Sequence, residues 1–320
     1  MSGLGDAVEM FLQALAAGLL VGAVYGLMCV GLGIIFGVMR VINFAQGDFL
    51  MLGMYFTLYL VVNLGVFSFL GPSAAPFAGA LLAGPVLFCG AYLLHKLLIS
   101  RVTGIQAAGT EGDGAHAQLI LTLGVALVLE NGGLILFGST PQAVRTPLSA
   151  RAWEIPLLYD DTSALFLNKA RTVAALVSIV VAIALYWLVN RSRLGKTLRA
   201  AADNAQAATY MGIDVDRAHR IAFGIGIGVT AIAGGLVATY SSFQPYVGLD
   251  YVIIMYAGVV LGGMGSILGA FWGGLTIGLV QQLSTLVLPI QLQNAAIFVV
   301  FLLIVLVRPQ GLFGRAAERV

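Results

Sequence analysis

The chain has 320 residues, of which 60% are hydrophobic and 9% are charged, with a net charge of +2 and a mean hydropathy of +0.98. A soluble domain carries roughly 25% charged residues, so this composition excludes a soluble protein and indicates an integral membrane protein. The small net charge gives no reason to expect a nucleic-acid partner.

Apolar stretches follow one another along the whole chain. A helical span needs about 20 apolar residues, and the candidates are 10–38, 46–63, 76–99, 117–138, 171–190, 217–240, 251–288 and 292–308. Two stretches interrupt this pattern, "VMRVINFAQGDF" at 38–49 and "GGMGS" at 262–266. The second leaves 251–288 as either two short helices or a span and a broken half-helix. We predict one all-α membrane domain over 1–320 with about eight transmembrane helices, some broken or re-entrant.

The positive-inside rule predicts the orientation of these spans. Residues 191–220 hold six Lys or Arg residues, so we place the loop 191–216 in the cytoplasm. Alternation then places 97–116 inside, and 139–170 and the N-terminus outside. The outer loop 139–170 also carries basic residues, which conflicts with the rule. The C-terminal tail lies inside if 251–288 crosses the membrane twice.

The cytoplasmic loop contains Gly195-Lys196-Thr197, the last three letters of a phosphate-binding loop. That motif also needs an earlier glycine after a buried strand. Asn190 occupies the glycine position and follows a long apolar run, so we expect no ATP site here.

The same loop predicts a short helix at about 204–211. Asp203 and Gln206 form a D-x-x-Q capping box, and Gly212 favours a left-handed stop. Such a helix is too short to hold its form alone in water. Ala205, Ala208 and Met211 give it a small apolar stripe. It is either a connecting helix lying on the membrane or a projecting helix that docks into a cleft on a separate cytoplasmic protein. The alanines favour the docking helix.

Two groups of polar residues lie between apolar runs at membrane depth: Asn43, Gln46 and Asp48, and the pair Glu130-Asn131. A charge at the bilayer centre costs at least about 2.5–3.5 kcal/mol, so neither acid is expected to face lipid. All five are candidates for a translocation path. Alternatively, Asp48 caps the helix that follows it, and Glu130 forms hydrogen bonds between helices.

The glycine break adds three further path candidates, Gly262, Gly263 and Gly265. A broken helix can expose backbone groups to a solute, although a close helix crossing explains the same glycines. His95, His116 and His219 have no metal-like spacing, and no nucleophile stands beside a base. We therefore expect neither an enzyme nor a metal site.

Four stretches together resemble a known family: "GLGIIFGVMRVINFAQGDFLMLGMY", "AADNAQAATYMGIDVDRAHRIAFGIGIGVTAIAGG", "GVVLGGMGSILGAFWGGLTIG" and "LVRPQGLFG". They are similar to the inner-membrane permeases of ABC importers in the branched-chain amino acid (LivH-like) family. The resemblance covers essentially the whole chain. Importer loops usually open with Glu-Ala-Ala, where this chain has Gln206-Ala207-Ala208.

The resemblance implies a type II-importer-like permease in the bacterial inner membrane that forms half of a path for branched-chain or other hydrophobic amino acids. It implies no cofactor of its own, because partner subunits bind ATP. The implied partners are a second, non-identical (LivM-like) permease, two cytoplasmic ATPases, a periplasmic binding protein and the bilayer. The implied ATPase-coupling residues are Arg199, Asp203, Asn204, Ala205, Gln206, Ala207, Ala208, Met211 and Gly212.

Two alternatives stay open. Related permeases carry urea, short amides or aromatic acids by the same mechanism. A different class, a channel or ion-coupled carrier without an ATPase, would use Asp48 and Glu130 as ion ligands.

Overall fold

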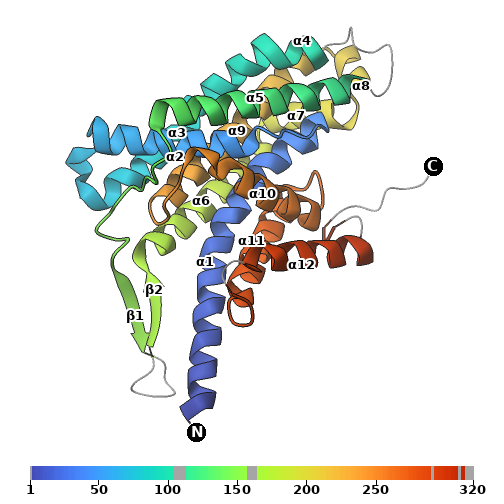
Figure 1. Ribbon diagram of the computed structural model, residues 1–320. Helices are drawn as coiled ribbons and strands as arrows, with labels where there is room; N and C mark the ends of the chain where they lie inside the picture. Colours follow the sequence, from blue (N-terminus) through green and yellow to red (C-terminus); the bar gives the residue numbers. More distant parts are fainter. Residues whose placement is uncertain (1, 104–112, 157–163, 290–291, 309–310, 314–320) are drawn as a thin grey trace.

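The computed structural model describes residues 2–103, 113–156, 164–289, 292–308 and 311–313. Its α-helices are α1 (Ser2–Met39), α2 (Gln46–Leu58), α3 (Gly71–Leu94), α4 (Ser100–Thr103), α5 (Asp113–Phe137), α6 (Lys169–Arg191), α7 (Arg193–Asp203), α8 (Ala205–Tyr210), α9 (Val215–Ala238), α10 (Gly248–Gly262), α11 (Ile267–Ser284) and α12 (Gln293–Val307) (Figure 1). Short π-helical turns (Tyr59–Asn63 and His95–Ile99) extend α2 and α3, and 3-10 turns (Ser68–Leu70 and Pro245–Val247) precede α3 and α10. Two strands, β1 (Ala152–Pro156) and β2 (Ala164–Asn168), complete the described elements.

Seven helical segments in the described part are long and apolar enough to cross a membrane: 5–39, 68–99, 117–137, 169–191, 215–238, 245–262 and 267–284. The predicted helical membrane fold is confirmed, and the predicted number of about eight spans is approximate. The two predicted spans missing from the seven are α2, with 13 residues before its π-helical turn, and α12, with 15.

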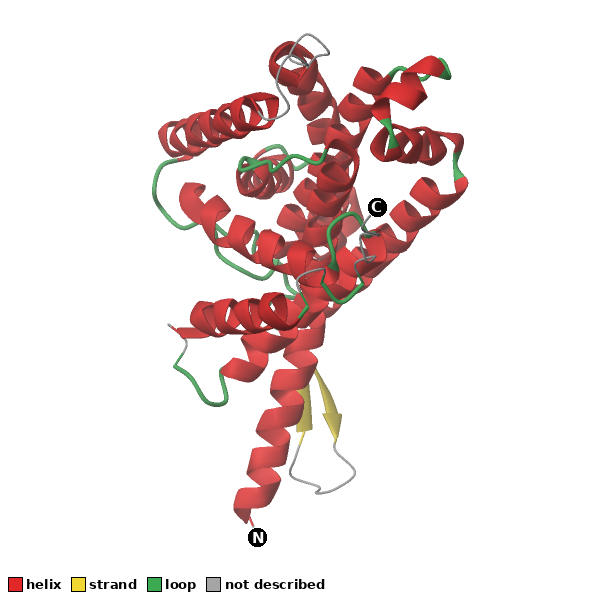
Figure 2. Ribbon diagram, turned by 90° about the vertical axis from the view of Figure 1, so that its right-hand side faces the viewer, coloured by secondary structure: helices red, strands yellow, loops and turns green. Residues whose placement is uncertain are grey.

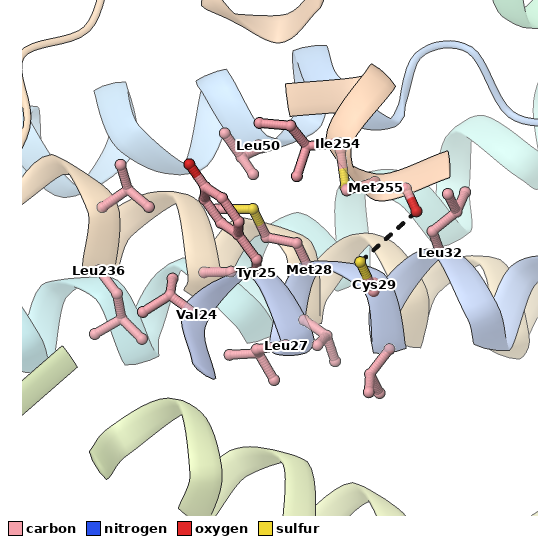
Figure 3. Packing of buried hydrophobic residues seen from close by; sticks show 14 of the residues in the cluster. Val24, Tyr25, Leu27, Met28, Cys29, Leu32, Leu50, Leu236, Ile254 and Met255 are labelled. Atoms are coloured by element: carbon pink, nitrogen blue, oxygen red, sulfur yellow. Dashed lines mark hydrogen bonds between the residues drawn. The ribbon is translucent and has the colours of Figure 1, made fainter. Parts of the chain in front are cut away.

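The helices α1 and α9 form the centre of the molecule. In each, 83% of the most apolar stretch is buried inside the chain, against 17% in α5. Figure 3 shows the α1 side chains Met28 and Cys29 close to side chains of α2 and α10. The Cys29 thiol donates a weak hydrogen bond to the carbonyl oxygen of Met255 (3.6 Å). Cys29 is therefore a small packing residue in the core.

Glycine lets the central helices approach one another closely. A Cβ on Gly31 of α1 would lie 2.6 Å from the carbonyl oxygen of Gly226 in α9, and a Cβ on Gly226 would lie 2.5 Å from that of Gly31. Both distances are shorter than any ordinary carbon contact. Without a hydrophobic driving force between helices in lipid, this backbone contact is a main source of packing energy.

The "GGMGS" break separates two complete helices. Gly263 and Gly265 take positive φ angles of 99° and 91°, and the Ser266 hydroxyl accepts a hydrogen bond from Gly269 N–H (3.1 Å) to start α11. The helices α10 and α11 pack on each other, so the two-helix alternative is correct and the broken half-helix is wrong. A Cβ on Gly37 would lie 3.2 Å from the Gly265 Cα, which places the break beside the end of α1.

The last described residues, 312 and 313, form hydrogen bonds to the end of α10, beside the turn between α10 and α11. Leu312 N–H donates to the carbonyl of Leu261 (2.8 Å), and Phe313 N–H donates to that of Gly262 (3.2 Å). These carbonyls belong to the last turn of α10, where no partner exists within the helix. Leu312 and Phe313 of the "LVRPQGLFG" motif thus supply backbone caps to a helix distant in the sequence.

The loop 139–170 contains an antiparallel hairpin, with Trp153 opposite Leu167, that was not predicted; residues 157–163 lie outside the described part. Figures 1 and 2 show it beside the projecting start of α1, at the opposite end from α7 and α8. The Gln13 side chain fixes the two together. Its amide donates to the Phe166 carbonyl (2.7 Å) and accepts from Phe166 N–H (3.0 Å).

Candidate functional site

The loop 191–216 folds as two short helices, α7 and α8, between α6 and α9. The Ser192 hydroxyl accepts a hydrogen bond from Gly195 N–H (3.0 Å) and caps α7. A side chain on Gly195 would collide with the backbone of Val189, so glycine permits the tight turn from α6 into α7. This packing explains the glycine of the Gly-Lys-Thr triplet without a phosphate ligand.

The predicted cap of the short helix was wrong by one residue. Asp203 is the last residue of α7, and the Asn204 side chain caps α8 by accepting from Ala207 N–H (2.9 Å). The backbone of Asn204 is extended (φ −152°), as an N-cap requires. The predicted range 204–211 shortens to Ala205–Tyr210. The predicted stop is confirmed: Gly212 has a φ of 82°, and Ile213 N–H donates to the Ala208 carbonyl (3.0 Å).

Only one residue of the predicted apolar stripe faces the chain's own interior. Ala208 is buried against the protein, whereas Ala205 is exposed and Met211 is 82% exposed. Tyr210, which the sequence analysis did not single out, is 87% exposed. Gln206 and Ala207 are also exposed. The last residue of α8 and the residue that follows it therefore present two large uncovered side chains.

Two further contacts hold the loop to the membrane-spanning helices. The Arg199 guanidinium donates to the Asn190 side-chain oxygen (2.8 Å) and to its backbone carbonyl (3.3 Å), which ties α7 to the end of α6. At the other end, Arg220 of α9 pairs with Asp214, the cap residue in the loop, at 4.0 Å, besides its 3.2 Å pair with Asp216 of the same helix. The loop is thus attached to α6 at one end and to α9 at the other, while α8 stays exposed.

The polar residues before and within α2 form a buried network with α9. Asn43 Nδ2 donates to Gln46 Oε1 (3.0 Å), and the Gln46 amide donates to the Thr230 hydroxyl (2.5 Å). Asn43 and Gln46 are 2% and 0% exposed. The Asn43 side-chain oxygen has no hydrogen-bond partner among the described residues. Thr230 was missed because a lone threonine in an apolar helix gives no signal in the sequence.

Asp48 lies at the meeting point of α2, α5 and α10. The alternative that it caps α2 is wrong, because α2 begins at Gln46 with Ala45 at the cap position and no side-chain cap. Asp48 is buried, and a Cβ on Gly248, the first residue of α10, would lie 2.8 Å from its carboxylate oxygen. The half-buried Glu130 of α5 is near enough for its charge to act on Asp48. These two acids therefore lie within electrostatic range of each other.

The remaining path candidates do not join this group. Asn131 is exposed on α5, and its amide donates to the Leu127 carbonyl of its own helix (2.8 Å). Gly262 packs on the backbone of Gly269, and Gly263 packs beside Gly311. The glycine break lies at the far end of α10 from Asp48, roughly 20 Å along the helix at 1.5 Å per residue.

The arrangement as a whole is a helical membrane unit with an uncovered short helix, α8, and a buried polar group between α2, α5, α9 and α10. A family model described as the branched-chain amino acid transport system / permease component matches residues 14–307. The chain belongs to this family.

Curated permeases of the family are similar to the chain over nearly its whole length. The high-affinity branched-chain amino acid transport system permease protein LivH of Escherichia coli (strain K12) is 29% identical over 95% of this chain and 96% of its own. LivH of Salmonella typhimurium is 30% identical over the same shares, and BraD of Pseudomonas aeruginosa is 27% identical over the same shares. No solved structure matches the chain significantly. The chain is thus a multi-pass inner-membrane permease component of an ABC transport system.

Proposed function

We propose that the chain forms one half of the translocation path of a binding-protein-dependent ABC importer for branched-chain or other hydrophobic amino acids. The partners in this proposal are a second, non-identical permease, two cytoplasmic ATPase subunits that bind and hydrolyse ATP, and a periplasmic substrate-binding protein. The relatives support the solute class, since they are named as branched-chain amino acid permeases.

One observation carries the ATPase part of the proposal: the exposed helix α8. It has six residues, and a helix of this length is not stable on its own. Caps at both ends hold its backbone, while Tyr210 and Met211 extend from it. Large apolar side chains uncovered in water favour burial in a partner. A cleft on an ATPase subunit would bury them.

In this mechanism ATP-driven closure of the ATPases displaces α8. The contacts of Arg199 with Asn190 and of Arg220 with Asp214 pass that displacement into α6 and α9. The helix α9 carries Thr230, to which the buried Gln46 of α2 is bonded. A tilt of α9 therefore reaches the polar group that lies between α2, α5 and α10.

The test is reconstitution into liposomes, with uptake of radiolabelled leucine as the measurement. The chain is compared alone and together with its proposed partners, the second permease, the ATPases and the binding protein. We expect uptake only from the complete set, and only when ATP is supplied on the side of the membrane that carries the ATPase subunits. A matched complex with a catalytically inactive ATPase is the control and should give no uptake.

Two results would overturn the proposal. One is uptake by the chain alone, driven by an ion gradient, which would make Asp48 and Glu130 ligands of an ion-coupled carrier. The other is an active complete complex that takes up urea or short amides but not leucine. That result would overturn the proposed solute class and keep the proposed mechanism.

A further inference from the structure

Arg40, directly after α1, has an unusual backbone. Its φ is 55°, the only positive φ of a non-glycine residue in the described part of the chain. Its N–H donates to the Phe36 carbonyl (2.8 Å), which closes the last turn of α1. A side chain disfavours this left-handed region because Cβ approaches the carbonyl oxygen. Such a conformation persists only where its surroundings hold it, and it often marks a functional position.

The Arg40 side chain is held by α7. Its guanidinium donates to the carbonyl of Ala202 (3.2 Å), a residue in the last turn of that helix. Carbonyls at a helix end have no partner within the helix, and the negative end of the helix dipole lies there. A cation from another element therefore suits this position. One charge-assisted hydrogen bond joins the α1–α2 corner to the cytoplasmic loop.

The bond lies between two functional segments. On one side, α7 ends one residue after Ala202, and Asn204 turns the chain into the exposed helix α8. On the other side, Asn43 and the first turn of α2, with Gln46, follow Arg40 within a few residues. Counted in residues along the chain, the route from α8 through Ala202 and Arg40 to Asn43 is shorter than the route through α9 to Thr230.

We propose that Arg40 is a positioning residue that transmits the displacement of α8 to the start of α2. The inference rests on the proposed function, since it needs a motor that moves α8. The guanidinium pulls on the 40–45 segment when the α7–α8 corner moves, and that segment carries Asn43 and Gln46. The strained φ keeps the side chain pointed at α7.

The test uses the complete importer in proteoliposomes and measures solute uptake per ATP hydrolysed. Arg40→Gly removes the guanidinium but accepts the positive φ, so the turn is kept. We expect an assembled complex whose ATP hydrolysis continues while uptake per ATP falls at least fivefold. Arg40→Lys, which keeps a cation, should recover part of the loss. Arg101→Gln, at an exposed arginine of α4, is the matched control and should behave as wild type.

A second measurement needs no variant. Hydrogen exchange of the wild-type complex is compared with and without a non-hydrolysable ATP analogue. We expect the amides of 43–46 to change their exchange together with those of α8. Wild-type uptake per ATP in Arg40→Gly would overturn the inference, as would unchanged exchange at 43–46 while α8 gains protection. Uptake by the wild-type chain without any ATPase would instead overturn the proposed function.

Discussion

Replacing Gly274 with alanine should loosen the contact between α1 and α11. An added Cβ would lie 2.6 Å from both the Gly26 nitrogen and the Tyr25 carbonyl oxygen of α1. Ordinary contact begins at 3.4 Å, so the two backbones must separate by about 0.8 Å. Overpacking a tight core costs about 1–3 kcal/mol, and alanine returns about 1 kcal/mol through its better helix propensity. The net effect lies between neutral and a loss of about 2 kcal/mol.

The matched control is Gly90→Ala in α3, where a Cβ would meet nothing within 4 Å. Both variants share the propensity gain, so their difference isolates the close contact and should be about 1–3 kcal/mol. The assay is thermal unfolding of the purified chain in detergent, followed by tryptophan fluorescence. Equal shifts of the midpoint in the two variants would refute the argument that backbone contact between α1 and α11 stabilises the fold.

Three further predictions concern caps and joints. Asn204→Ala should weaken α8 by about 1 kcal/mol and speed hydrogen exchange at the amide that Asn204 caps, whereas Asp203→Ala should leave that exchange unchanged. Truncation after Gly311 removes two N–H donors to the end of α10 and should lower the thermal midpoint, by about 0.5–1.5 kcal/mol for each bond; truncation after Phe313 keeps both bonds and serves as its control. Gln13→Ala should speed exchange at the β2 amide that now bonds to Gln13, with no change in α6.

Each of these has a contrary outcome. A larger effect from Asp203 than from Asn204 would restore the capping box predicted from the sequence. Equal midpoints for the two truncations would mean that the backbone caps on α10 contribute no stability. Unchanged exchange in β2 without Gln13 would mean that the hairpin holds itself against α1.

The spans were predictable because hydropathy acts locally. Each stretch of about 20 apolar residues has one favourable state in a bilayer, so the spans, the break after Gly262 and the stop at Gly212 could be read from neighbouring residues. The predicted N-cap of α8 was wrong by one position, because Asp203 and Asn204 both suit the role and the length of α7 decides between them.

The rest of the candidate site depended on contacts between distant segments. The bonds from Gln46 to Thr230 and from Gln13 to Phe166 join residues more than 150 positions apart. The hairpin strands have only five residues each, and their pairing is supported by α1. The sequence offered Asp48 as a helix cap because its neighbours in the chain allow one. In the structure its carboxylate instead faces residues of α5 and α10.

The backbone bonds of Leu312 and Phe313 to the last turn of α10 affect how the protein is made. Leu312 and Phe313 follow the end of α10 by about 50 residues, so they leave the ribosome only after α10 and α11 have been made. The carbonyls of Leu261 and Gly262 therefore lack these two donors until synthesis has passed Phe313. A polypeptide that terminates between α11 and Leu312 would carry α10 without these two bonds.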